Sequence, residues 1–224
     1  MSIKNAVLTA ASTLAVASCL SAAGTLSADA ATPECGPHCV QIFSAKFGTP
    51  THPGFVETVL GGVAAAGVPT GLSPVSSTDS AGDLIVSRAG LVSDFYAAGL
   101  VSAAVNEHYA NLHAVQIQYA PHGERTGLCA GLAKAAYQNE RLSLQPCSTP
   151  GTTAFIIDTA DSPATAPMVF PIVSGSTTDF VHPFAMTIDG NPAHEGFLPI
   201  HVRHLKGNPS DVHENQLWGS NVLN

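Results

Sequence analysis

Short apolar segments recur along most of the chain, separated by clusters of Gly, Pro, Ser and Asp. The segments are rich in Val, Ile, Phe and Thr, which favour strands, and the residues between them favour turns. This pattern predicts an all-β domain. The predicted strands lie within residues 40–47, 55–60, 114–120, 141–147, 153–159, 168–175, 184–190 and 199–205.

One segment departs from this pattern. Residues 93–113 read SDFYAAGLVSAAVNEHYANLH, with Ala-rich spacing that suits a helix and with Ser93 or Asp94 as a helix cap. Two strands separated by Gly99 are the alternative, and the sequence leaves it open. We expect one short helix here.

The first thirty residues differ in character from the rest. Lys4 precedes a run rich in Ala, Val and Leu, and Ala28-Asp29-Ala30 forms a small-x-small cleavage signal. Residues 1–30 are therefore interpreted as a signal peptide that is removed, which predicts a secreted protein with no membrane span. Val16-Ala17-Ser18-Cys19 also resembles a bacterial lipobox, so a lipid anchor at Cys19 is the alternative.

The remaining residues fit a single domain. The chain has 224 residues and 45% hydrophobic content, which is enough for one sizeable core and leaves little room for two. No linker divides residues 31–224, so they are predicted to form one domain. We also expect a monomer. Charged residues make up only 11% of the sequence and the formal net charge is -8, which disfavours binding to nucleic acid or to an anionic membrane.

Four cysteines remain after the signal peptide. In an exported chain an even number indicates disulfides, and four cysteines allow three connectivities. We favour Cys35–Cys39 with Cys129–Cys147, because each pair is local in sequence. A metal site at Cys35, His38 and Cys39 is the less favoured alternative, since no second ligand pair has zinc-site spacing.

Two segments behave as copies of one unit. Residues 127–159 and 183–221 each contain a strand, a turn-rich excursion, a second strand and a third strand centred on an aromatic residue. The second segment ends in Gln216-Leu217-Trp218, and the first carries Thr153-Ala154-Phe155 at the matching place.

These features resemble the ricin-type β-trefoil, a three-fold barrel whose repeats carry a Gln-x-Trp signature. The resemblance is clear over residues 126–224, and a third repeat in residues 40–125 is needed to close the barrel. It implies that Trp218 packs in the core, that Gln216 ties neighbouring backbone together, and that Cys129 and Cys147 close a disulfide inside one repeat. The chain also resembles a group of secreted bacterial proteins with an ATPEC start and an NQLWG end.

In ricin-type lectins a sugar is held by an Asp, an aromatic platform and an Asn before the signature. A carboxylate accepts hydrogen bonds from sugar hydroxyls, and the apolar face of the sugar stacks on the aromatic ring. In this sequence the Asp position falls on Gly131 and Thr187, and the platform position on Gln145 and Arg203. Only Asn215 matches.

The resemblance therefore predicts the scaffold more strongly than a sugar site. Asp189-Gly190-Asn191 reads first as a hairpin turn, with a place in a ligand site as the minor interpretation. The candidate ligand-binding residues are Asn215, Arg203 and Asp189.

Catalytic and metal-binding motifs are not evident. His201 and His204 would point to opposite faces of a strand, and there is no His-Glu-x-x-His, nucleophile elbow or phosphate loop. Asp158 and Asp161 could suggest a carboxylate pair for glycoside hydrolysis, but a turn after a strand explains them more simply.

We therefore expect a secreted, non-catalytic binding module for an extracellular glycan or protein, without cofactor or metal. The alternative is a secreted hydrolase or protease-inhibitor-like protein that acts through long loops of the first repeat, residues 60–82, LGGVAAAGVPTGLSPVSSTDSAG.

Overall fold

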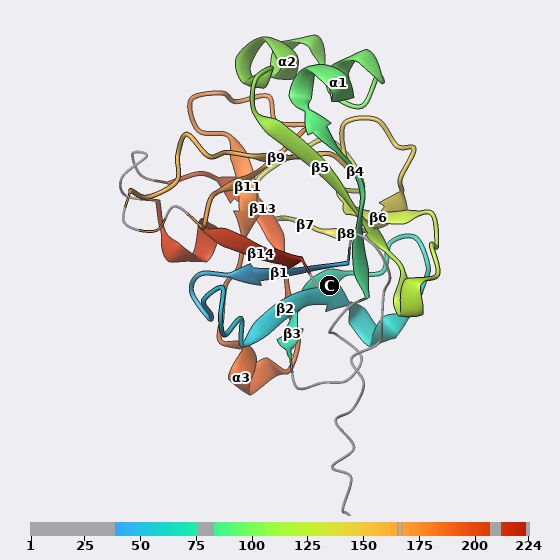
Figure 1. The fold of residues 1–224 in the computed structure, drawn as a ribbon, viewed down its shortest axis with the longest axis vertical. Coiled ribbons are helices and arrows are strands. Elements are labelled where there is room, and N and C mark those ends of the chain that lie inside the picture. Colours follow the sequence, from blue (N-terminus) through green and yellow to red (C-terminus); the bar gives the residue numbers. More distant parts are fainter. Residues whose placement is uncertain (1–38, 76–82, 165, 167, 207–211, 223–224) are drawn as a thin grey trace, which may run out of the picture.

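A computed structural model describes residues 39–75, 83–164, 166, 168–206 and 212–222. Strands form most of it and surround a central core, while two short helices lie together at one end (Figure 1). The predicted signal peptide, the lipobox cysteine Cys19 and Cys35 lie outside the described residues. The strands are β1 (Val40–Ser44), β2 (Phe55–Val59), β3 (Thr70–Pro74), β4 (Leu84–Leu91), β5 (His113–Tyr119), β6 (Leu128–Gly131), β7 (Glu140–Arg141), β8 (Ser143–Pro146), β9 (Phe155–Ile157), β10 (Ile172–Ser174), β11 (Phe184–Thr187), β12 (Leu198–Pro199), β13 (His201–His204) and β14 (Trp218–Val222).

The strands pair antiparallel in three groups. The largest runs in the order β7-β13-β11-β10-β9-β5-β6-β8, with β4 also paired to β5. A second group has the order β12-β3-β2, and a third joins β1 to β14. The last pairing brings the two ends of the described chain together, with Val40 opposite Val222 and Ser44 opposite Trp218. The sheet is therefore nearly closed into a barrel.

Alternation along the strands creates two apolar clusters. Successive side chains of a strand point to opposite faces. In β9, Phe155 packs in the barrel interior, whereas Ile156 belongs to a second cluster outside it. In β10, Ile172 and Val173 divide in the same way. The barrel thus has a core of its own and a second buried layer on its outer face.

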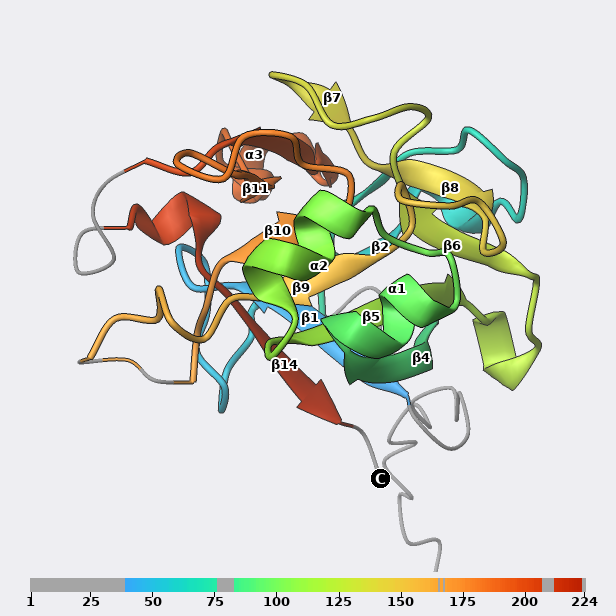
Figure 2. The ribbon, with the colours of Figure 1, turned by 90° about the horizontal axis from the view of Figure 1, so that it is seen from above.

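The helices cover this outer layer. α1 (Val92–Ala97) and α2 (Ala103–Tyr109) lie over β5 and β9 when the molecule is seen from above (Figure 2). Phe95 of α1 and Val105 of α2 are fully buried in the outer cluster. In the described part of the chain no helix is long and apolar enough to cross a membrane.

The segment around residue 100 contains two helices where one was expected. Asp94 does not stand at the N-cap position; it lies in the first turn of α1, where its Oδ2 accepts a hydrogen bond of 3.0 Å from Leu91 N. Ser102 caps α2, because its Oγ accepts from Val105 N at 3.2 Å. Gly99, which suggested a break between strands, has a φ of 72° and separates the two helices.

The structure adds strands to those predicted. β3 contains Gly and Pro and falls within the loop expected over residues 60–82, yet it pairs with both β2 and β12. A Cβ atom at Gly71 would lie 2.2 Å from the carbonyl oxygen of Leu198, so this pairing requires glycine. The turn-like composition of β3 reflects a close backbone approach. Residues 76–82 lie outside the described part.

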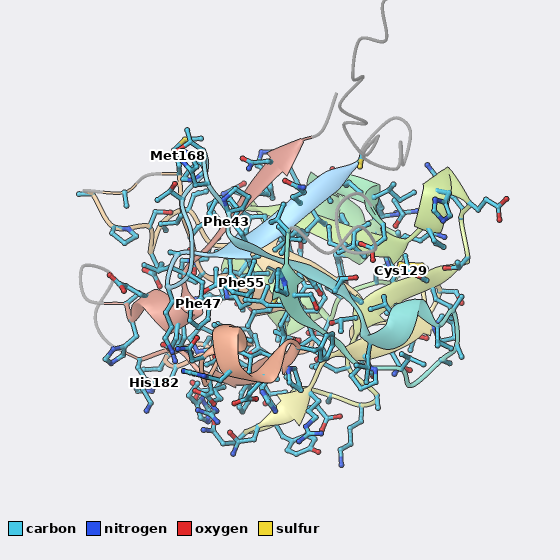
Figure 3. The ribbon with its side chains drawn as sticks, turned by 90° about the horizontal axis from the view of Figure 1, so that it is seen from below. Phe43, Phe47, Phe55, Cys129, Met168 and His182 are labelled. Carbon is cyan, nitrogen blue, oxygen red and sulfur yellow. A yellow bond between two sulfur atoms is a disulfide. The ribbon has the colours of Figure 1, made fainter. Side chains whose placement is uncertain are left out.

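The large side chains follow the same division between core and surface. Phe43 is fully buried and lies toward the middle of the molecule in Figure 3, whereas Met168 is 67% exposed and lies at its rim.

The predicted disulfide Cys129–Cys147 is present, with a Cα–Cα distance of 4.9 Å. Cys39 is also disulfide-bonded.

α3 (Pro192–Glu195) follows the turn at Asp189-Gly190-Asn191. Gly190 has a φ of 78°, which favours glycine in such a turn. Three single turns of 3-10 helix complete the described elements: η1 (Leu60–Gly62), η2 (Pro121–Gly123) and η4 (Glu214–Gln216).

Candidate functional site

The two C-terminal repeats share their backbone geometry. In the middle repeat, Gly131 pairs with Ser143 across β6 and β8, and in the last repeat Thr187 pairs with His201 across β11 and β13. The two positions assigned to the ligand-binding Asp, Gly131 and Thr187, thus occupy the same place in their hairpins. Gln145 and Arg203, at the platform position, likewise lie on the second strand of each hairpin.

The structure brings the three candidate ligand-binding residues together. Asn215, Arg203 and Asp189 line one polar pocket of about 230 Å³, which we call the last-repeat pocket. Thr187, Lys206, His213 and Gln216 complete its lining. The hairpin β11–β13 and the turn η4 supply the pocket, so it lies where the resemblance places a sugar site.

Arg203 and Asp189, two of the charged residues of this pocket, already pair with each other. Arg203 Nη2 lies 2.5 Å from Asp189 Oδ2, and its Nε donates to Asn139 Oδ1 at 2.5 Å. A guanidinium held on two sides offers no apolar face comparable to an aromatic platform. The pocket can donate and accept hydrogen bonds through Asn215 and Lys206, but it lacks the stacking surface that usually binds a pyranose ring.

The signature residues lie beneath this pocket. Gln216 is buried, and its Nε2 donates to Thr187 Oγ1 at 3.0 Å and to the His204 carbonyl at 3.1 Å. Trp218 is fully buried, and its Nε1 donates to the Met186 carbonyl at 2.9 Å. Both side chains therefore join strands of the barrel, and Trp218 offers no free surface to a ligand.

A larger pocket lies beside the helices. It has a volume of about 580 Å³, and we call it the helix-side cleft. Its lining combines aromatic rings, histidines and carboxylates from α2, the segment after β9 and the segment before β11. The lining residues that carry the argument below are His108, Tyr109, Asp158, Asp161, Phe180 and His182.

Three rings form one cluster in the cleft. The centroid of Phe180 lies 5.0 Å from that of His108 and 6.1 Å from that of Tyr109, and the His108 and Tyr109 centroids are 4.6 Å apart. Tyr109 is buried, while Phe180 is partly exposed. The cluster thus presents aromatic surface to the cleft from a supported position.

A short turn holds Phe180 in place. Asp179 Oδ1 accepts hydrogen bonds of 2.9 Å from both Val181 N and His182 N. These bonds hold the pKa of Asp179 below its usual range. The loop that carries Phe180 is therefore fixed by its own hydrogen bonds, although Val181 is 81% exposed.

Two carboxylates stand beside the rings. Asp158 is buried, and its Oδ1 accepts hydrogen bonds from Ala160 N at 3.2 Å and Asp161 N at 3.3 Å, as in a turn after a strand. Burial raises the pKa of Asp158, with the charge of Asp161 adding to the effect, and burial also raises the pKa of Asp161. The pKa of Tyr109 is raised by its burial and by these carboxylates. The carboxylates thus make this side of the cleft acidic and rich in hydrogen-bond acceptors.

The sequence did not reveal this cleft. Asp158 and Asp161 were interpreted as turn residues, which agrees with their hydrogen bonds, but nothing in the pattern joins them to Phe180 or to α2. The only available signal was an aromatic residue, Phe180, in a polar loop between predicted strands, since such a residue has no obvious core to enter.

Comparisons with known proteins support the fold. No protein family matches the sequence, and no curated protein matches it either. Among solved structures, the designed 3-fold symmetric protein ThreeFoil matches with a TM-score of 0.51 and 10% identity, over 82% of this chain and 98% of that chain. A mosquitocidal holotoxin matches with a TM-score of 0.50 and 13% identity, over 83% of this chain and 17% of that chain.

Together with the nearly closed strand arrangement, these matches define the chain as an all-β trefoil. At such low identity they establish the fold alone, since one fold serves many functions.

Proposed function

We propose that this protein is a secreted, non-catalytic binding module that recognises a carbohydrate in the helix-side cleft. The observation that carries the proposal is the aromatic cluster of Phe180, Tyr109 and His108 beside the buried carboxylate of Asp158. Stacking surface next to a hydrogen-bond acceptor is the combination that sugar rings require.

The two pockets offer different chemistry to a sugar. The last-repeat pocket retains Asn215, but a cation stands at its platform position and already pairs with Asp189. The helix-side cleft has aromatic rings together with acceptors, and its 580 Å³ exceeds the 230 Å³ of the last-repeat pocket. Of these two pockets, the helix-side cleft is the one that combines aromatic stacking surface with hydrogen-bond acceptors. We therefore propose that the saccharide binds there.

A two-stage binding experiment tests this proposal. The mature chain is first applied to a glycan array, and the best-bound glycan is then titrated calorimetrically. Phe180→Ala should weaken binding by about tenfold or more, because stacking on an aromatic ring is removed. Asp158→Asn keeps an oxygen for the turn but changes the acceptor, and it should also weaken binding.

Asn215→Ala in the last-repeat pocket is the matched control and should leave the affinity unchanged. If Asn215→Ala abolishes binding and Phe180→Ala does not, the saccharide lies in the last-repeat pocket and our placement is wrong. If the correctly folded chain binds no glycan on a broad array, the proposal that it recognises carbohydrate fails.

A further inference from the structure

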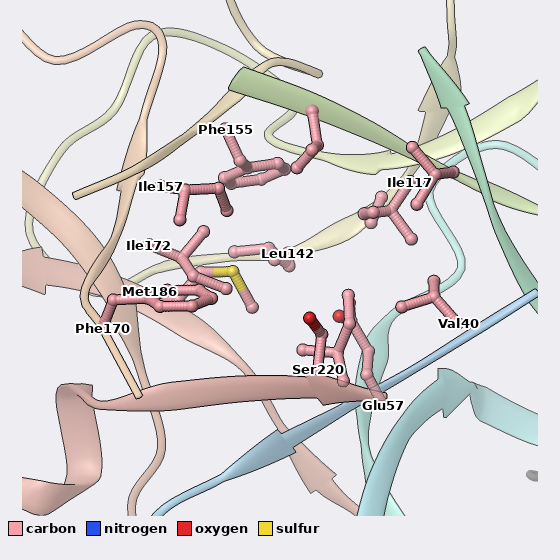
Figure 4. Close-up of a pocket in the computed structure, with 14 residues that line it drawn as sticks. Val40, Glu57, Ile117, Leu142, Phe155, Ile157, Phe170, Ile172, Met186 and Ser220 are labelled. Carbon is pink, nitrogen blue, oxygen red and sulfur yellow. The ribbon is translucent and has the colours of Figure 1, made fainter. Parts of the chain in front are cut away.

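The barrel encloses a cavity of about 120 Å³ that is separate from both surface pockets (Figure 4). Side chains from strands all around the barrel line it, so it is the interior of the barrel itself. All of the lining residues are apolar except Glu57 and Ser220. The apolar side chains labelled nearest its middle include Leu142, Phe155, Ile172 and Met186.

Glu57 is the one acidic residue in this lining. The register of β2 and β3 places it opposite Leu72, a fully buried core residue, so its side chain faces the barrel interior. Glu57 is 2% exposed, and its Oε1 has no hydrogen-bond partner among the residues that the structure describes. Figure 4 shows Glu57 among the residues that surround the cavity.

A buried carboxyl oxygen without a partner destabilises the fold unless something satisfies it. Burial raises the pKa of Glu57 to about 7; the Thr70 hydroxyl lowers it in part, and the negative charge of Asp83 raises it further. Asp83 is itself buried and accepts a hydrogen bond from Thr58 Oγ1. The neighbouring charge that acts on Glu57, that of Asp83, is therefore negative and favours a cation nearby.

The cavity reaches toward the surface on one side. Ser220, which lines it, is exposed, and Val86, Val115, Ile157 and Phe170 in the same lining are only partly buried. These residues are the part of the lining through which a small molecule could enter. Other lining residues, such as Leu142, are fully buried.

The two signature positions suggest why the space exists. Phe155 occupies the place in the middle repeat that Trp218 occupies in the last, and Phe155 lines the cavity whereas Trp218 does not. Phenylalanine fills less volume than tryptophan, so the barrel interior is less completely filled on this side.

We propose that the barrel cavity binds a small apolar primary amine, whose ammonium group donates to Glu57 Oε1 and whose alkyl group lies among the apolar lining residues. An apolar protein cavity of about 150 Å³ accepts benzene, so 120 Å³ suits an alkyl group of about four carbons. The amine completes the hydrogen bonding of Glu57 and neutralises a charge that burial disfavours. This inference does not depend on carbohydrate binding in the helix-side cleft.

Isobutylamine is the probe, and isobutanol, which has the same shape but no charge, is its control. Each is titrated into the mature chain at pH 8, where Glu57 is mostly ionised and the amine is still protonated, and NMR chemical shifts of the lining methyl groups are followed. Isobutylamine should bind saturably and about tenfold or more tightly than isobutanol, because a hydrogen bond to a charged group is stronger than a neutral one.

Two variants locate the binding. Glu57→Gln keeps the shape of the side chain but removes its charge, and it should abolish the preference for the amine. Ala130→Leu extends a side chain into the cavity and should exclude both probes while leaving Glu57 in place. The Ala130 variant keeps the test decisive if the Glu57 variant fails to fold.

Equal binding of isobutylamine and isobutanol to the unmodified chain would overturn the proposal, because Glu57 would then not recognise the ammonium group. Binding of the amine that survives Ala130→Leu would place it elsewhere and would also overturn it. Failure of the amine to bind would indicate that water satisfies Glu57 and that the cavity has no amine ligand.

Discussion

The middle and last repeats build the same backbone with different side chains. In the middle repeat, Leu132 N donates to the Thr152 carbonyl at 2.9 Å; in the last repeat, Ile188 N donates to the Asn215 carbonyl at the same distance. These hydrogen bonds fall at equivalent places before the two signature positions. The conformation of the repeat is thus maintained although one signature retains Gln and Trp and the other does not.

The side chains that stabilise each repeat differ. The last repeat uses Gln216 and Trp218, both buried and hydrogen-bonded across strands. The middle repeat has Phe155 at the Trp position, and its disulfide joins Cys129 of β6 to Cys147, the residue after β8. A covalent link constrains the unfolded chain, whereas the glutamine acts through contacts in the folded state. Similar backbones can therefore be held by quite different interactions.

The largest expected effect tests the two aromatic positions against each other. Trp218→Ala should lower the free energy of unfolding by about 3–5 kcal/mol, the range for a large aromatic residue in a core. Phe155→Ala should fall near the lower end, about 3 kcal/mol, because Phe155 already borders a cavity. Urea unfolding of both variants measures the difference. An equal or larger loss for Phe155→Ala would show that the two positions are equally well packed.

The sequence predicted the fold class because alternation and turn residues are local signals. All eight predicted segments contain described strand residues. β3 was not predicted as a strand, because it contains the Gly71 that its close approach to β12 requires and so reads as a turn. Such a segment becomes a strand because it pairs with strands that are distant in sequence, and local composition does not encode that pairing.

The candidate site was predicted only in part. The repeat alignment placed Asn215, Arg203 and Asp189 in one neighbourhood, and they do line one pocket, because alignment to a repeated unit carries three-dimensional information. The helix-side cleft joins Tyr109 to Phe180 through the packing of α2 on the barrel, and no periodic pattern encodes such a contact. The burial of Glu57 was also not evident from the sequence, since one acidic residue in a strand normally faces solvent.

Glu57, on β2, makes the stability of the barrel sensitive to pH. Its pKa in the folded chain is about 7, against an ordinary value of 4.5, so the folded state holds a proton that the unfolded state releases between these values. Stability should therefore fall as the pH rises from about 4.5 to 7, by about 3 kcal/mol at most. Glu57→Gln should remove this loss.

Urea unfolding of the unmodified chain and of Glu57→Gln at pH 4.5, 6 and 8 provides the measurement. The difference between the two chains isolates Glu57, since other groups such as His201, whose pKa is lowered by burial, titrate equally in both. The variant should gain stability relative to the unmodified chain as the pH rises. A constant difference across the three pH values would indicate that the carboxyl group is hydrated.

The disulfide of the middle repeat and Gln216 of the last repeat can be compared directly. Replacing Cys129 and Cys147 together by Ala should cost about 3 kcal/mol, because the link closes a loop with a sequence separation of 18. Gln216→Ala should cost about 2 kcal/mol, since buried hydrogen-bonding groups on Thr187 and His204 lose their partner. Denaturant titrations of both variants give these values. A negligible effect of Gln216→Ala would mean that Trp218 alone holds the last repeat.

The smallest effect is expected at the surface of the last repeat. Asp189 and Arg203 form an ion pair, but their side chains are 44% and 29% exposed, so Asp189→Asn should change stability by less than about 1 kcal/mol. Arg203 would still donate to Asn139 and would remain near the pocket.

Because the lining of the last-repeat pocket contains no Phe, Tyr or Trp in the described residues, calorimetric titration with galactose should give no binding tighter than about 1 mM before or after the change. Micromolar binding that Asn215→Ala abolishes would show that hydrogen bonds alone form a sugar site here, and the last repeat would then be the functional one.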